Sequence, residues 1–233
     1  MGARTPWSLL LCSFALAAFS AVAAAQSPGS PASNALRFFE AHRALDPRAV
    51  LRELRPPQIG PDDRARALSV LPETGDLRPT RDERAKLSMI EPVLVFHHRE
   101  QVVETRLVDS PQAAVVLHQR AVLLISRPAL RLMSGAELQA VVAHEIGHEY
   151  FWTDFEPMRS RRHGRGHQEL ELKCDGIAVL TLVALGLDPG LLVEAVRKLT
   201  QFNETLGATN ANQYPPVSDR QRFVNALRER TGW

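Results

Sequence analysis

Two histidines and a glutamate in the middle of the chain have the spacing of a metal-dependent hydrolase. His144 and His148 are four residues apart in the run HEIGH, and Glu145 follows the first of them. On an α-helix this spacing is a rotation of about 400° and a rise of about 6 Å, so both imidazoles share one face. Two such imidazoles can hold Zn²⁺, and the adjacent carboxylate can take a proton from a water molecule that the metal activates. The pattern therefore predicts a zinc site with Glu145 as the general base.

The residues before this motif predict the helix that carries it. Ser134 and Glu137 form a capping box, which starts a helix about ten residues before the first histidine. Leu138, Val142 and Ile146 form an apolar stripe roughly 200° around the helix from the histidines. The helix should therefore be buried on both sides. The alternative interpretation is a pair of core histidines that bind no metal.

A catalytic zinc has a third protein ligand and keeps its fourth position for water. Glu171 and Asp175 are four residues apart, and the same face continues to Ala178 and Leu182 in an apolar run. Two buried carboxylates at this spacing repel each other unless a cation lies between them. We therefore expect Glu171 to be the third ligand. Asp175 should accept a hydrogen bond from the other ring nitrogen of a ligand histidine.

Other downstream residues fit this role less well. Phe151 and Asp154 stand where the metzincin pattern requires a glycine and a histidine, so that class of protease is excluded. His163 and His167 are also four apart, but two glycines and several arginines surround them. This composition predicts a basic surface loop. The alternative is a mobile lid beside the zinc, because the segment joins the two ligand helices.

A third motif follows near the C-terminus, where Tyr214-Pro215-Pro216 precedes Arg220. Together with residues 134–150 and the Glu171/Asp175 pair, it resembles the HtpX-like and CAAX-prenyl-endopeptidase-like family of gluzincin metallopeptidases. The resemblance runs from about residue 94 to the C-terminus. It implies a zincin-like fold, and the ligands and base that it implies agree with those reached from spacing.

The chain departs from that family at two positions. Tyr214 stands where members commonly carry a histidine. Its hydroxyl can still donate to a developing oxyanion, and Arg220 can add positive charge there, which makes both expected catalytic residues. Alternatively, Tyr214 is only a turn residue before two prolines. Cys174 replaces the small residue usual before the acid, and we expect a buried, inert side chain.

The N-terminus has the features of an export signal. Residues 1–25 contain Arg4, an apolar core from Leu9 to Val22 and a small-residue cleavage pattern at residues 23–25. They predict a cleaved signal peptide and a periplasmic or secreted protein, with an uncleaved membrane anchor as the alternative. Cys12 should leave with the peptide. The mature chain of 233 − 25 = 208 residues then has one cysteine and no internal disulfide.

Composition excludes some partners. The 28 basic and 26 acidic residues leave a charge of +2, without a long basic run that alternates with aromatic residues. Nucleic acid is therefore not an expected partner. Residues 26–92 show short helical patterns interrupted by prolines, and they should either wrap the catalytic part or occlude its cleft. Residues 93–233 should form the catalytic domain.

Four short runs predict a small sheet beside the motif helix, in an α+β, mostly helical domain. They are residues 93–97, 102–107, 113–118 and 121–126, with a hairpin turn at Gln119-Arg120. An open edge strand of this sheet could bind substrate backbone. His97, His98 and His118 are interpreted as ordinary strand or turn residues. Residues 191–202 and 219–230 predict two amphipathic packing helices.

The combined prediction is a zinc metalloendopeptidase that holds one Zn²⁺ per chain and cleaves extended or unfolded protein substrates. The competing class is a binding or chaperone-like protein with the same scaffold, in which the metal is structural or the cleft is blocked. A scaffold without metal is a third possibility.

Overall fold

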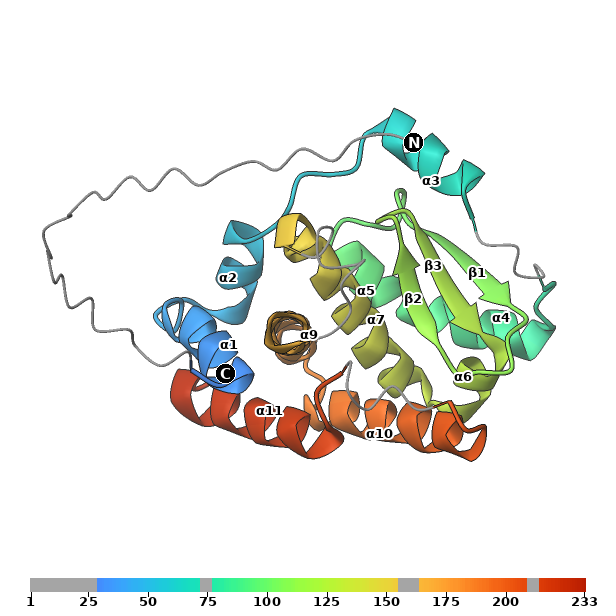
Figure 1. The fold of residues 1–233 in the computed structure, drawn as a ribbon. Coiled ribbons are helices and arrows are strands. Elements are labelled where there is room, and N and C mark those ends of the chain that lie inside the picture. Colours follow the sequence, from blue (N-terminus) through green and yellow to red (C-terminus); the bar gives the residue numbers. More distant parts are fainter. Residues whose placement is uncertain (1–28, 72–76, 155–163, 209–213) are drawn as a thin grey trace, which may run out of the picture.

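Helices surround one small sheet in the computed structural model, which describes residues 29–71, 77–154, 164–208 and 214–233 (Figure 1). The predicted signal peptide and His163 lie outside these ranges. The helices are α1 (Pro31–Glu40), α2 (Pro47–Glu53), α3 (Pro61–Ser69), α4 (Arg81–Leu87), the 3₁₀ turn η1 (Ser88–Ile90), α5 (Glu91–Phe96), α6 (Arg127–Leu132), α7 (Gly135–Tyr150), α9 (Arg165–Ala184), α10 (Gly190–Thr205) and α11 (Val217–Thr231). The strands are β1 (Glu104–Val108), β2 (Val115–His118) and β3 (Val122–Ser126). The prediction of a mostly helical protein with a small sheet is confirmed.

The sheet has the order β1-β3-β2, so β2 lies at an edge. β1 runs parallel to β3, and β2 runs antiparallel to β3 with Leu117 opposite Leu123. Gln119 and Arg120 both have positive φ angles, 50° and 63°, as in tight hairpin turns. The predicted hairpin is therefore confirmed. Helix α7 packs against β2, which places the edge strand beside the motif helix.

One predicted strand is wrong, because residues 93–97 lie in and just after helix α5. Pro92 sits in the first turn of that helix, a position where its fixed φ and missing N–H are tolerated. An apolar run this short has no periodicity that separates a strand from a buried helical turn. His97 therefore caps a helix, and His98 has a φ of 55°, outside any strand.

Helices α7 and α9 form the centre of the fold. The capping box predicted for α7 is present, with the Ser134 side chain accepting from the Glu137 amide and the Glu137 side chain accepting from the Ser134 amide. At Gly147 the two helices approach so closely that a Cβ atom would lie 2.8 Å from the Cys174 Cα. The glycine within the HEIGH motif therefore allows α9 to pack against the histidine-bearing helix.

The N-terminal helices α1 and α2 share a core with α9 and α11. Leu36, Phe39 and Leu51 are buried there, and the Phe39 ring fills the space where Gly176 has no side chain. Helices α1 and α2 both pack against α9, and α1 also packs against α11. Helices α10 and α11 confirm the two predicted packing helices. Within the described ranges, we find no helix with the length and hydrophobicity to span a bilayer.

Candidate metal centre

The structure places the three motif residues of α7 close together. His144 and His148 are buried, with 7% and 8% of their surface exposed, and their ring centroids are 5.1 Å apart. One potential ligand atom from each of His144, Glu145 and His148 lies within 4.8 Å of the others. This group could hold a metal ion, as the spacing predicts.

Glu171 reaches this group from α9. Its Oε2 atom lies 3.4 Å from His144 Nε2, and its Oε1 atom lies 3.7 Å from His148 Nε2. Ligand atoms around a tetrahedral zinc ion, each about 2.0–2.2 Å from it, are about 3.3–3.6 Å apart. The distances from this carboxylate to each of the two imidazole nitrogens are therefore close to those between ligands of one zinc ion.

Both ligand histidines have a partner at their other ring nitrogen. Asp175 Oδ1 lies 2.8 Å from His144 Nδ1, as predicted for an orienting acid. Cys174 Sγ lies 3.3 Å from His148 Nδ1. The thiol is buried as expected, and burial raises its pKa well above the usual value. Its contact with His148 shows, however, that it is more than a small apolar filler. Two consecutive residues of α9 thus orient the two histidines of α7.

Arg220 lies in α11 and contacts both carboxylates of α9. Its Nη2 atom donates to Glu171 Oε2 at 3.0 Å, and its Nη1 atom donates to Asp175 Oδ1. The side chain is buried, with 3% of its surface exposed. These contacts differ from the predicted oxyanion role, because the guanidinium is directed at the two acids. Arg220 therefore holds the Glu171 and Asp175 carboxylates in place.

The charges of the group leave room for a divalent cation. When ionised, Glu145, Glu171 and Asp175 bring three negative charges, and Arg220 brings one positive charge. The sum is −2 when both histidines are neutral, as metal ligation requires. Burial opposes charge on His144, but hydrogen bonds with Asp175 and Glu171 outweigh it and raise its pKa to about 10. Burial lowers the pKa of His148 to about 4, which favours the neutral form of this ring. The acids therefore attract positive charge, and the donor set fits zinc.

Glu145 is held beside the edge of the sheet. Its Oε2 atom accepts a hydrogen bond of 3.0 Å from the backbone N–H of Leu117 in β2. Burial raises the pKa of this carboxyl to about 7. A carboxylate whose pKa is near the working pH is well suited to act as a general base.

The prediction that His167 lies in a surface loop is wrong. The predicted basic loop ends earlier, and His167 lies in the first turn of α9 with only 5% of its surface exposed. Gly164, with a φ of 112°, is the residue before the helix, so the helix begins just after it. His167 Nε2 is 3.8 Å from Glu171 Oε1. The four-residue spacing from His167 to Glu171 was the available signal, and the nearby glycines concealed it.

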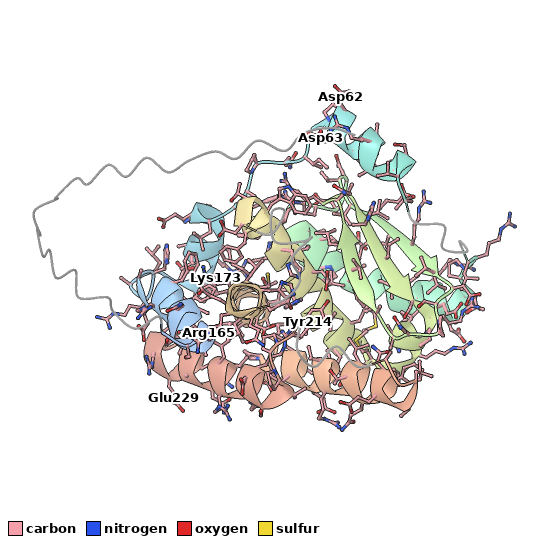
Figure 2. All side chains as sticks on the ribbon, in the orientation of Figure 1. Asp62, Asp63, Arg165, Lys173, Tyr214 and Glu229 are labelled. Carbon is pink, nitrogen blue, oxygen red and sulfur yellow. The ribbon has the colours of Figure 1, made fainter. Side chains whose placement is uncertain are left out.

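Tyr214 lies at the outer side of this group. It is 38% exposed, and its ring centroid is 5.6 Å from that of His167. Figure 2 labels the Tyr214 side chain. The segment that carries it leads through Pro216 into α11 and thus to Arg220. The third sequence motif therefore contacts the two acids of α9 through Arg220, while Tyr214 lies against His167 beside them.

No family model matches the chain, and no curated protein is significantly similar to it. The resemblance of its motifs to gluzincin metallopeptidases therefore stays a prediction.

Proposed function

We propose that the protein is a zinc-dependent metalloendopeptidase. The observation that carries the proposal is the approach of the Glu171 carboxylate to the Nε2 atoms of His144 and His148, next to Glu145. Three protein ligands and one nearby general base are what a catalytic zinc site contains. The partners of the two Nδ1 atoms support the same proposal, because they leave both Nε2 atoms facing Glu171.

The residues of the chain divide the chemistry among them. Zinc bound by His144, His148 and Glu171 would supply Lewis acidity at the scissile carbonyl and acidify a water molecule. Glu145 takes the proton of the attacking water and returns it to the leaving amine. The Leu117 N–H fixes the orientation of that carboxylate. The Tyr214 hydroxyl is the side chain that we assign to the developing oxyanion, since Arg220 is paired with the two acids.

The edge strand β2 suggests what kind of substrate is bound. The carbonyl groups of Ala114 and His118 accept hydrogen bonds from Ser126 and Ala121, on the β3 side of the strand. Successive residues of a strand direct their backbone groups to opposite sides in turn. Leu117 therefore turns its backbone N–H away from β3 and toward Glu145. An extended peptide could add to this edge as a further strand, with its scissile bond beside the base. Extended or unfolded protein segments are the proposed substrates.

The proposal predicts zinc-dependent proteolysis by the purified protein. We expect cleavage of an unfolded, casein-type substrate, loss of cleavage with a chelator, and recovery when zinc is added back. The measurement combines metal content with substrate cleavage under these three conditions. Bound zinc without cleavage at high protein concentration would contradict the proposal in favour of a binding or chaperone-like protein. A metal content near zero would indicate a scaffold without metal.

A further inference from the structure

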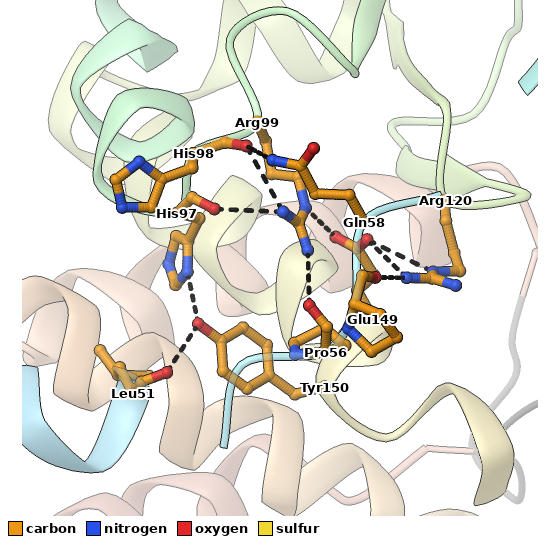
Figure 3. A network of polar contacts seen from close by, with 10 residues as sticks. Leu51, Pro56, Gln58, His97, His98, Arg99, Arg120, Glu149 and Tyr150 are labelled. Atoms are coloured by element: carbon orange, nitrogen blue, oxygen red, sulfur yellow. Dashed lines mark hydrogen bonds and ion pairs between the residues drawn. The ribbon is translucent and has the colours of Figure 1, made fainter. Parts of the chain in front are cut away.

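A second polar cluster lies at the end of α7, directly after the last ligand histidine. Glu149 is fully buried, and its Oε2 atom accepts a hydrogen bond of 2.7 Å from Arg99 Nε (Figure 3). Its Oε1 atom accepts one of 3.1 Å from Arg120 Nη2. We call these three residues the Glu149 clamp. None of them belongs to the metal centre.

The clamp joins α7 to three other parts of the chain. Arg99 follows α5 and is 1% exposed, and its Nη2 atom donates to the Pro56 carbonyl at 3.4 Å. Arg120 lies in the hairpin turn between β2 and β3, and its Nη2 atom also donates to the Pro57 carbonyl. One carboxylate thus fixes the hairpin turn and the segment after α2 against the end of the motif helix (Figure 3).

The same hairpin contacts α7 at a second point. Leu117, three residues before Arg120, donates its backbone N–H to Glu145, which is four residues before Glu149. The edge strand is therefore attached to α7 through two carboxylates one helical turn apart, about 6 Å along the axis. Arg120 and Leu117 therefore each give the hairpin a polar contact with a carboxylate of α7.

Stability alone is a poor explanation for the clamp. Desolvation of buried ion pairs can exceed their mutual attraction, so apolar side chains at such positions are often as stable. Two guanidinium groups also face one carboxylate here. Ion pairs of this geometry can instead hold the segments that they join in one defined arrangement.

We propose that the Glu149 clamp sets the position of the β2 edge relative to Glu145, which makes Arg120 a positioning residue for substrate binding. This inference rests on the proposed function, because it assumes that substrate backbone pairs with β2. It assigns to the hairpin turn a role in the alignment of substrate and base.

The test compares Arg120→Ala with wild type and with Arg127→Ala, a control at the opposite end of β3 that loses an ion pair with Glu83. Arg120→Ala keeps the buried Arg99–Glu149 pair, so it is expected to fold. Glu149→Gln instead leaves the buried Arg99 and the partly buried Arg120 without this counter-charge. We expect hydrogen exchange of the Leu117 amide to accelerate about tenfold or more, as for the loss of one charge-assisted hydrogen bond. KM for the casein-type substrate should rise by a similar factor, with zinc affinity unchanged.

Arg120→Lys keeps the charge, so its amide exchange and its KM should both lie closer to the wild-type values than those of Arg120→Ala. Unchanged exchange at Leu117 in Arg120→Ala, or equal acceleration in Arg127→Ala, would overturn the inference. Amide exchange needs no proteolysis, so this result separates failure of the clamp from failure of the proposed function. If exchange accelerates while KM stays the same, the clamp positions the strand without serving substrate binding, and the inference is also overturned.

Discussion

Glu145→Gln should lower the rate of cleavage by about 10²–10⁴-fold while the protein keeps its zinc and its fold. Glutamine has nearly the same shape as glutamate, and its side-chain oxygen can still accept the hydrogen bond from the Leu117 N–H. It cannot take the proton of the attacking water. The ligands His144, His148 and Glu171 are untouched, so the metal content should equal that of wild type. Initial rates on the casein-type substrate, with metal analysis of the same samples, make the measurement.

Glu169→Gln is the matched control for this variant. Glu169 lies on α9 near the third ligand in sequence, but its carboxylate pairs with Lys173 and Asn34 outside the metal centre. Its replacement should leave the rate close to that of wild type. Turnover by Glu145→Gln at the rate of Glu169→Gln would show that another group is the base.

Arg220→Met should lower the free energy of unfolding of the metal-free protein by about 3–5 kcal/mol. The guanidinium is the positive charge closest to Glu171 and Asp175 in the described residues. Its removal breaks two buried ion pairs and leaves both carboxylates with protonated His144 as a positive partner. Zinc brings positive charge to the same carboxylates, so part of the lost stability should return when the metal binds. Urea denaturation of chelated and zinc-loaded samples measures both quantities.

Arg222→Ala is the control for charge removal from the same helix. Its side chain is exposed and pairs with Asp219 at the surface, so the expected change is within about 0.5 kcal/mol. An equal loss of stability in chelated and zinc-loaded Arg220→Met would contradict the role of this arginine beside the metal. Equal stability of Arg220→Met and wild type, both without metal, would contradict this role as well.

The α7 part of the site was predictable because its signals are local. The capping box at Ser134 and the four-residue spacing of His144 and His148 fix one helix and one of its faces. The spacing of Glu171 and Asp175 identified the second helix in the same way, since buried acids need a cation. Helical periodicity thus supplies much of a metal site when its ligands come in pairs.

The remaining features depend on contacts between distant segments. The partners of Arg220 are 45 and 49 residues away in sequence. No local sequence pattern shows that its guanidinium forms ion pairs with them. His167 was misplaced because glycine lowers helix propensity, although Gly164 only precedes the helix. Residues 93–97 were misassigned because a short apolar run fits a strand as well as a buried turn of helix.

The most direct test of the account is the zinc affinity of Glu171→Gln compared with wild type and Glu169→Gln. We expect one zinc ion per chain in wild type and in Glu169→Gln. Loss of a residue that only orients a ligand already weakens metal binding by about 10–100-fold. Loss of a ligand in Glu171→Gln should therefore raise the dissociation constant for zinc by at least about tenfold. Wild-type protein that binds no zinc, or a Glu171→Gln variant that binds it as tightly as wild type, would contradict the claim that α7 and α9 together form the metal centre.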